Sequence, residues 1–250
     1  MIEYELRTDI GTRDEQQDSA HAQLTNGLFT AVLCDGMGGH KGGAIASGIA
    51  VREFMSAAAS GLIDRNSIPE SLISCAEKTN RLVFDLCDKS GARLDAGTTL
   101  VSIVIDENKL YWLSAGDSRL YIIRNGKITQ ITKDHNYFYV LDRLLSERRI
   151  SEEEYQRKSK GGNALISYIG ISKLDIIDIN LEPFILYPGD IILLCSDGLF
   201  KIMDNDDILR CIDERTDRSA DNLMDFIRRS GNTRKDNSTF IIVRMRCSVI

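Results

Sequence analysis

The chain has 250 residues, of which 43% are hydrophobic and 27% charged, and its formal net charge is -6. This composition is that of a globular protein with a sizeable core, and it excludes a disordered or fibrous chain. The acidic balance leaves no basic footprint, so we expect neither nucleic acid nor an anionic membrane surface as a partner.

The N-terminus and the cysteines indicate the compartment. Residues 1–7 lack the apolar core of a signal peptide, and no stretch approaches the ~18 apolar residues of a membrane span. The six cysteines are widely spaced, without a C-x-x-C pair, and most lie in apolar runs. Reduced, buried thiols are therefore favoured over disulfides or a zinc site. We expect a cytoplasmic protein of one domain.

The first part of the chain combines strands with two long helices. A short apolar strand ends abruptly at Asp35 before a glycine-rich turn, and Ser67-Ile68-Pro69-Glu70 has the pattern of a capping box. The elements predicted here are strands at residues 2–8, 18–25 and 29–34, a turn at Asn26-Gly27, and helices from Ala44 to Ala58 and from Ser67 to near Gly91.

The second part is richer in strands. We predict strands at residues 98–105, 109–115, 119–124, 127–131, 176–181, 191–195 and 239–245, with helices near 206–212 and 219–229. Residues 134–173 are charged, with a short helix at Ser151-Glu152-Glu153-Glu154, and we interpret them as an excursion from the core. Short turns between consecutive strands favour antiparallel pairing. The order of elements predicts an α+β fold of antiparallel sheets flanked by helices.

Three aspartates lie at ends of predicted strands. Asp35 and Asp197 each follow an apolar strand and precede a glycine, and Asp236 comes just before the last strand. A sheet can bring such ends together, and the glycine leaves the Gly36 carbonyl open to an ion. Because Mg²⁺ and Mn²⁺ prefer carboxylate, carbonyl and water oxygens, these residues indicate a hard-metal site.

Asp117 and Arg13 each have two interpretations. Asp117 lies in a tight turn, where its carboxylate either caps local N–H groups or contributes to the metal site. Arg13 is either a solvated loop charge or, beside a metal cluster, a bidentate clamp for a phosphate.

Seven motifs follow one another in an order that resembles the type 2C, metal-dependent Ser/Thr protein phosphatases, in their bacterial single-domain form. They are Arg13 with Gln17-Asp18, Asp35-Gly36-Met37-Gly38-Gly39, Gly97-Thr98-Thr99, Gly116-Asp117-Ser118-Arg119, Thr132-Lys133-Asp134-His135, Ser196-Asp197-Gly198-Leu199 and Asp236-Asn237. The resemblance covers nearly the whole chain. It implies a single phosphatase domain over residues 1–250, built as a central antiparallel β-sandwich flanked by pairs of α-helices in four layers, with residues 134–173 as a flap.

The resemblance also implies a metal site that holds two Mn²⁺ or Mg²⁺ ions. Asp35 would bridge the two ions, with Asp197 and Asp236 on the first and the Gly36 carbonyl on the second. Asp18 would hold a metal-bound water. Asp117 would help to bind a third, weaker ion.

Two positions depart from the pattern of the family. Gln17 stands where many relatives carry Glu, which removes one charge and keeps an oxygen acceptor. Met37 stands where the animal enzymes have a histidine proposed as general acid, so another proton donor is needed. We expect His40 and His135, although close in sequence to the motifs, to have structural roles.

The implied reaction is hydrolysis of phosphoserine and phosphothreonine in proteins by the water that bridges the ions, with Arg13 orienting the ester and no covalent phosphoenzyme. We expect a monomer that opposes a Ser/Thr kinase in signalling. Two alternatives remain. One is a non-catalytic interaction module on the same fold, which the presence of all three metal-binding aspartates argues against; the other is a two-metal phosphodiesterase or nuclease, which the acidic charge disfavours.

Overall fold

The computed structural model describes residues 1–38, 42–231 and 233–247. Its strands are β1 (Ile2–Asp9), β2 (Asp18–Thr25), β3 (Leu28–Gly38), β4 (Ala96–Thr98), β5 (Leu100–Asp106), β6 (Lys109–Ala115), β7 (Arg119–Arg124), β8 (Lys127–Gln130), β9 (Asp178–Ile179), β10 (Phe184–Ile185), β11 (Ile191–Cys195) and β12 (Ser238–Met245). Its helices are α1 (Gly42–Ala59), α2 (Ile68–Phe84), α3 (Tyr137–Ser146), α4 (Glu152–Lys158), the 3₁₀ turn η1 (Ser159–Gly161), α5 (Asp197–Phe200), α6 (Asn205–Cys211) and α7 (Thr216–Arg229).

Within the described residues, the strands form two antiparallel sheets. One has the order β1-β12-β11-β7-β8, and the other has the order β10-β6-β5-β3-β2, with β4 paired to β3 and β9 to β6. The first strand of the chain and the last one described are neighbours, paired from Ile2 with Met245 to Asp9 with Ser238. The strand β12 therefore lies inside its sheet rather than at an edge.

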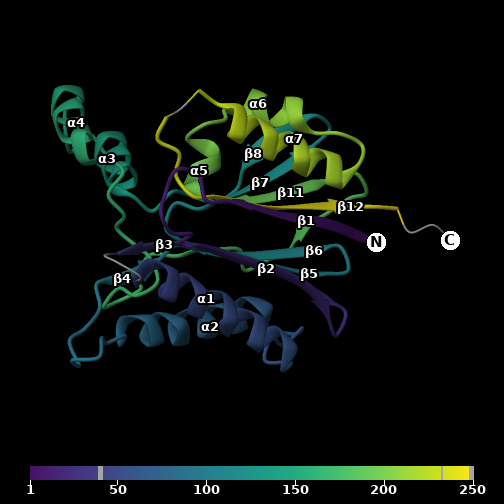
Figure 1. The fold of residues 1–250 in the computed structure, drawn as a ribbon, viewed down its shortest axis with the longest axis horizontal. Helices are drawn as coiled ribbons and strands as arrows, with labels where there is room; N and C mark the ends of the chain where they lie inside the picture. The colour runs from purple at the N-terminus through teal and green to yellow at the C-terminus, as the bar shows by residue number, and fades with distance from the viewer. Residues whose placement is uncertain (39–41, 232, 248–250) are drawn as a thin grey trace.

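The two sheets pack face to face, with helices on both outer sides (Figure 1). The helices α1 and α2 cover one sheet, and α6 and α7 cover the other. Both faces of β12 are buried, because Ile241 and Val243 point into the space between the sheets while Phe240 and Ile242 meet the α6–α7 layer. The apolar run of this strand follows from burial on both sides. The predicted four-layer αββα sandwich is confirmed.

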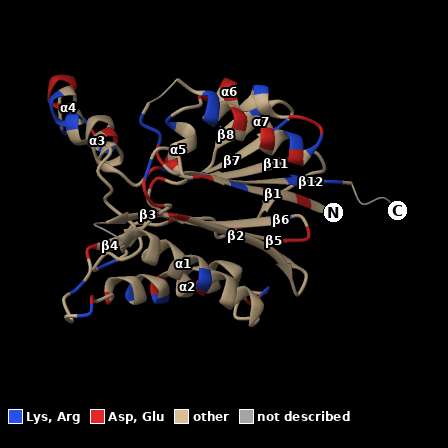
Figure 2. Ribbon diagram, in the orientation of Figure 1, with Lys and Arg blue, Asp and Glu red and all other residues tan. Residues whose placement is uncertain are grey.

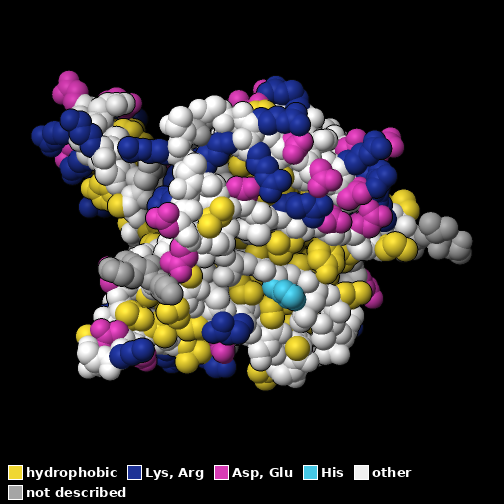
Figure 3. Space-filling model, viewed as in Figure 1, with side chains coloured by type: hydrophobic (Ala, Val, Ile, Leu, Met, Phe, Trp, Pro, Cys, Tyr) yellow, Lys and Arg dark blue, Asp and Glu magenta, His cyan; other side chains and the backbone are white. Residues whose placement is uncertain are grey.

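Charged side chains lie on the outside of the sandwich. In the space-filling view, basic and acidic side chains are intermixed over α6 and α7 (Figure 3). Four of the cysteines are buried, as expected (Cys34, Cys75, Cys195 and Cys211), whereas Cys87 and Cys247 are exposed, contrary to the expectation. Among the described residues, no helix is both long and apolar enough to cross a bilayer.

Two predictions for the first part of the chain are wrong. The strand β3 does not end at Asp35 but continues to Gly38, because Gly36, Met37 and Gly38 pair with β4. The capping box at Ser67 does not form, since the Ser67 side chain makes no capping hydrogen bond, and α2 ends at Phe84 rather than near Gly91.

The second part differs mainly in its short elements. The flap, residues 134–173, contains α3 in addition to the helix expected at Glu152, and both helices project away from the sandwich (Figure 1). The strand predicted at 176–181 shrinks to the two residues of β9, and the one-turn helix α5 follows directly after Ser196. The strand predicted at 98–105 is divided into β4 and β5. Both pair with β3, β4 with residues 36–38 and β5 with residues 28–33.

Candidate metal and phosphate site

Asp35 is held inside β3, opposite Asp18 of β2. Its N–H donates to Thr99 Oγ1 at 2.9 Å, and its carbonyl accepts from the Thr99 N–H at 2.8 Å. Thr98 Oγ1 donates to the same carbonyl at 2.9 Å. The N–H and the carbonyl of Asp35 are thus both held by the junction of β4 and β5, and this fixes the backbone from which the carboxylate extends.

Gly36 permits a close approach of three backbone segments. A Cβ at this position would lie 2.2 Å from the carbonyl oxygen of Gly43 in α1 and 2.6 Å from that of Gln17. The Gly36 N–H donates to the same Gln17 carbonyl at 3.1 Å. Any larger residue would push β3 away from α1 or from the loop before β2.

Asp18 is a buried carboxylate with one oxygen satisfied. Ser196 Oγ donates to Asp18 Oδ2 at 2.8 Å and accepts the Thr239 N–H at 3.0 Å. Asp18 Oδ1 is buried without a hydrogen-bond partner. Burial, reinforced by the charges of Asp197 and Asp236, raises the pKa of Asp18 to about 6.

Asp197 begins α5, and Lys201 follows it one helical turn later. Asp197 Oδ2 accepts a hydrogen bond from Lys201 Nζ, while Asp197 Oδ1 is buried without a partner. The Lys201 side chain is 53% exposed and that of Asp197 only 15%. Sequence analysis missed Lys201. The signal was available, because opposite charges four residues apart face each other on a helix.

Asp236 lies in the loop before β12 and is paired with Arg13. Arg13 Nη2 lies 2.8 Å from Asp236 Oδ2. Next to it, the Asn237 amide donates to the carbonyls of Ile10 and Glu15 at 2.9 and 3.1 Å. The loop that carries Arg13 is therefore tied to the loop that carries Asp236, although the two are more than two hundred residues apart in sequence.

These residues meet at one cavity of about 490 Å³. Arg13, Asp35, Gly36, Asp197 and Asp236 all line it. Burial, followed by the charges of the neighbouring aspartates, raises the pKa of Asp35 well above its usual range. The cavity thus collects carboxylates that repel one another, and it favours protons or cations between them.

The donor set fits a hard divalent cation, although it is not a ready-made cage. In the ranges that the structure describes, no three His, Cys, Asp or Glu side chains stand together as a metal-holding group. Arg13 and Lys201 instead pair with the carboxylates of Asp236 and Asp197. The partnerless Oδ1 atoms of Asp18 and Asp197 nevertheless leave negative charge unbalanced, and oxygen donors of this kind suit Mg²⁺ or Mn²⁺.

Asp117 lies in the turn between β6 and β7 and lines a second cavity of about 260 Å³, which Asp35 and Asp197 also border. Burial, followed by the charge of Asp197, raises the pKa of Asp117 to about 6. Buried His135 supports this turn, because its Nδ1 accepts the Gly116 N–H at 3.2 Å. This contact agrees with the structural role expected for His135, whereas His40 lies outside the described residues.

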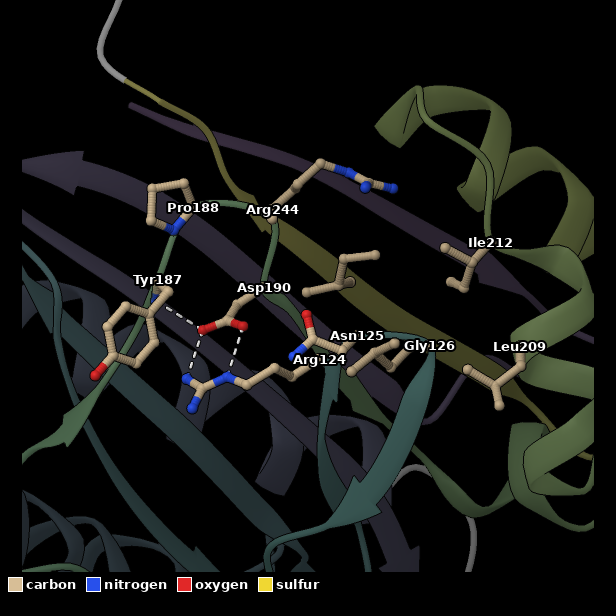
Figure 4. A pocket seen from close by; sticks show the side chains of 12 residues that line it. Arg124, Asn125, Gly126, Tyr187, Pro188, Asp190, Leu209, Ile212 and Arg244 are labelled. Atoms are coloured by element: carbon tan, nitrogen blue, oxygen red, sulfur yellow. Dashed lines mark hydrogen bonds and ion pairs between the residues drawn. The ribbon is translucent and has the colours of Figure 1, made fainter.

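A cavity of about 690 Å³ lies elsewhere, between the β7–β8 turn, the loop before β11 and α6. Its charged pair is already satisfied, because Arg124 makes two hydrogen bonds to Asp190 at 2.8 and 2.6 Å (Figure 4). The Tyr187 N–H also donates to Asp190, at 2.7 Å. None of the predicted site residues lines this cavity, so we do not assign the chemistry to it.

Comparisons with known proteins agree on one family. The family model described as protein phosphatase 2C matches residues 8–230. The protein phosphatase PhpP of Streptococcus pneumoniae is 30% identical over 249 residues, which cover 98% of each chain. Among solved structures, the serine/threonine phosphatase of S. agalactiae has a TM-score of 0.83 at 27% identity, covering 98% of this chain and 100% of that one.

A second structure is that of the catalytic domain of the serine threonine protein phosphatase PstP in complex with two manganese ions. It has a TM-score of 0.76 at 28% identity and covers 98% of this chain and 99% of that one. Since both the family model and relatives at this level of identity extend over most of its length, the chain belongs to the protein phosphatase 2C family.

Proposed function

We propose that the chain is a metal-dependent Ser/Thr protein phosphatase that hydrolyses phosphoserine and phosphothreonine in proteins. The observation that carries the proposal is the cavity where Arg13 and the carboxylates of Asp35, Asp197 and Asp236 converge, next to buried oxygens without partners. Membership of the protein phosphatase 2C family supports the same reaction.

We assign the metal ligands as the motifs suggest. Asp35 would contribute to the binding of two Mn²⁺ or Mg²⁺ ions, Asp197 and Asp236 would help to hold the first, and the Gly36 carbonyl would help to hold the second. Asp18, opposite Asp35 on β2, would hold a water bound to the metal. When bound, such ions activate water as a nucleophile and offset the charge of the phosphoryl oxygens. The PstP relative described with two manganese ions supports this count.

The chain's own groups provide orientation. Arg13, which is 59% exposed and lies on the rim of the cavity, can turn its guanidinium from Asp236 to the phosphate once cations offset the aspartate charge. Buried Asp18 stays fixed by Ser196. Asp117, which lines the second cavity together with Asp35 and Asp197, would help to hold a third, weaker ion. Because Met37 cannot donate a proton, a water held at that third site would be our candidate for the donor of the proton that the leaving group takes up.

The wider setting extends the same proposal. Residues 1–250 act as one phosphatase domain with residues 134–173 as its flap, and the protein works as a cytoplasmic monomer on phosphoproteins. It opposes a Ser/Thr kinase in signalling. Neither nucleic acid nor a membrane is a partner, in keeping with the net charge of -6.

The test compares p-nitrophenyl phosphate and a bis-ester substrate, each with and without Mn²⁺. A phosphatase releases phosphate from the mono-ester only when Mn²⁺ is present. Preferential cleavage of the bis-ester would indicate a phosphodiesterase, and no turnover of either substrate would indicate a non-catalytic module. Asp197→Asn and Asp236→Asn serve as controls that should abolish the Mn²⁺-dependent rate; unchanged rates in both variants would eliminate the assigned site.

A further inference from the structure

The cavity that Asp35, Asp197 and Asp236 line, here called the carboxylate cavity, adjoins another one, which we call the basic cavity. The basic cavity has a volume of about 570 Å³, and its charged lining residues are Arg13, Lys201, Arg234, Lys235 and Asp236. Four of these five side chains are cationic, in a chain whose net charge is -6. Basic side chains gathered against the overall charge of a protein create a local field that attracts anions.

The basic cavity is continuous with the proposed phosphate position. Arg13 and Asp236 line both this cavity and the one that contains Asp35. Lys201, which directly follows α5, lines the basic cavity, and so do Arg234 and Lys235 of the loop that leads to β12. Figure 2 shows basic residues, in blue, along this loop. A peptide whose phosphate lies at Arg13 would therefore place a neighbouring residue within reach of Arg234 and Lys235.

The loop that carries these two cations is anchored by its backbone. The Thr12 N–H donates to the Lys235 carbonyl at 3.0 Å, and the Lys235 N–H donates to Thr12 Oγ1 at 3.1 Å. A Cβ on Gly11 would lie 2.3 Å from the Asp236 carbonyl oxygen, so the two loops are packed backbone to backbone. The backbone that carries the two cations is thus fixed, and the Lys235 ammonium is itself held by a hydrogen bond to the Arg228 carbonyl. A fixed position of the charge favours a defined binding position over a diffuse attraction.

The charge around Arg13 is also one-sided. The carboxylate cavity is bordered by Asp14 and Glu15, which lie beside Arg13 in the sequence and do not line the basic cavity. An anionic side chain is attracted toward Lys235 and repelled on the side of Glu15. A bound segment should therefore show a charge preference on one side of its phosphorylated residue.

We propose that the basic cavity binds the acidic flank of a phosphoprotein segment, a carboxylate or a second phosphate close to the phosphoserine that is hydrolysed. This inference rests on the proposed phosphatase activity and adds a substrate class to it. A polynucleotide is a poorer match, because it needs a basic stripe along its backbone rather than a single cavity.

The test uses phosphoserine peptides that differ only in their flanks: neutral, aspartates before the phosphoserine, aspartates after it, or a second phosphoserine at the better of the two flanks. The measured quantity is kcat/KM relative to the neutral peptide. We expect one acidic flank, and not the other, to raise it about three- to tenfold, as for one or two exposed charge pairs. The second phosphoserine should raise kcat/KM at least as much as the aspartates do, and added salt should reduce the preference for the acidic flank.

The variant Arg234→Ala/Lys235→Ala should bring the ratio of acidic to neutral peptide close to one. The ratio corrects for any general loss of activity in the variant. Lys109→Ala/Lys127→Ala is the matched control. It removes the same charge from the exposed first residues of β6 and β8, outside the basic cavity, and should keep the preference.

A second measurement does not depend on turnover. Fluorescence anisotropy of the labelled peptides without divalent ions should rank the affinities in the same order, and the ranking should vanish in Arg234→Ala/Lys235→Ala. If Mn²⁺ supports no hydrolysis but this ranking holds, the phosphatase proposal fails and the docking site stands. Equal affinities for all flanks, or a preference that survives the double variant, would overturn the docking site.

Discussion

Two single residues, Arg13 and Lys201, have the same relation to the carboxylates of the site. Each is more than half exposed, and each pairs with a carboxylate that we assign to the first metal ion. These ion pairs offset the charge of the carboxylates while no metal ion is bound. A metal ion can replace either basic group, because both basic groups already face solvent. Both residues thus link occupancy of the metal site to the availability of cations for the phosphate.

The first prediction concerns Arg13→Ala. Loss of a charge-assisted hydrogen bond to the phosphate should cost about 1.5–3 kcal/mol, which raises KM for a phosphopeptide at least about tenfold. Affinity for Mn²⁺, measured by calorimetry, should rise slightly, since Asp236 loses a competing partner. Arg65→Ala, which removes an exposed arginine paired with Asp106, is the control. An unchanged KM together with weaker Mn²⁺ binding would make Arg13 a structural residue.

The second prediction concerns Asp117→Asn. If Asp117 helps to hold a third ion, the neutral amide loses most of its attraction for that ion, while the two inner ions remain. The variant should bind two Mn²⁺ ions tightly and melt near or above the parent temperature, because burial disfavours the carboxylate. Its turnover of a phosphopeptide should fall about a hundredfold, the scale of losing a proton donor. Parent-like turnover at saturating Mn²⁺ would return Asp117 to a turn-capping role.

The sequence predicted which residue types meet at the site but not how they pair. Motifs far apart in the chain, carrying Arg13, Asp35, Asp197 and Asp236, do line one cavity. Their roles as ligands stay predictions. The ion pair of Lys201 was missed because a helix of one turn has no hydrophobic periodicity to reveal it, and only the charge spacing marks it.

At the level of elements, hairpins were predicted best. The bounds of β6 and β7 match, and Asn125-Gly126 marks the next turn, because tight turns have local chemistry that a sequence displays. The end of β3 was wrong because Gly36 and Gly38 carry no side-chain pattern, and their pairing with β4 depends on a partner sixty residues away. The helix α3 was missed because it buries only Leu141 and lies in a charged segment.

The flap is joined to the sandwich through a narrow base. Tyr137 and Phe138 donate to the carbonyls of Ala164 and Gly162 at 2.9 Å each. At the same base, Asn136 and Asn163 line the cavity that contains Asp117. The two limbs of the flap thus run together at the edge of the site, while α3 and α4 stand away from it (Figure 1).

The third prediction is that a short Gly-Ser linker between Asn136 and Asn163 can replace the flap helices. The limbs remain paired outside the excised part, because the Ile166 N–H donates to the His135 carbonyl at 2.9 Å and Asn136 forms a bridge with Leu165. The excision should therefore leave the sandwich folded. Discrimination among phosphoproteins should change several-fold, more than hydrolysis of p-nitrophenyl phosphate, because a surface segment beside the site contacts large substrates and not small ones. Equal losses on both kinds of substrate would contradict this division.

At the level of the whole molecule, the carboxylate cluster makes stability depend on pH. The folded-state pKa values of Asp18 and Asp117 are each raised from 3.8 to about 6. Between pH of about 4 and 6 the folded protein therefore binds more protons than the unfolded chain, so these groups make stability fall as pH rises through this window. Buried His135, whose pKa is lowered, acts in the opposite direction near the upper end.

The fourth prediction compares melting temperature with EDTA and with Mn²⁺ from pH 5 to pH 7.5. His135 contributes equally to the measurements with EDTA and with Mn²⁺. The difference between the two melting temperatures therefore reports on the carboxylates alone. Stabilisation by Mn²⁺ should grow with pH, because protons compete with the ion at pH 5 and the ionised carboxylates repel one another at pH 7.5. The stabilisation by Mn²⁺ should increase by about 3 kcal/mol between pH 5 and pH 7.5, roughly one pKa unit for each of the two groups, because the upper half of their titration lies within this range. If the difference in melting temperature did not change with pH, the aspartates would not be the groups that bind the metal.

The position of β12 has a consequence for the order in which a ribosome delivers this chain. This strand is made last among those described, yet it lies between β1, made first, and β11. Until it emerges, one sheet lacks an interior strand, β1 has no partner in it, and neither Asp236 nor Asn237 can join the loop of Arg13. Pairing of such distant segments is slow and comes after synthesis. A nascent chain without these residues has no assembled site, so the enzyme cannot act on phosphoproteins while it is still being made.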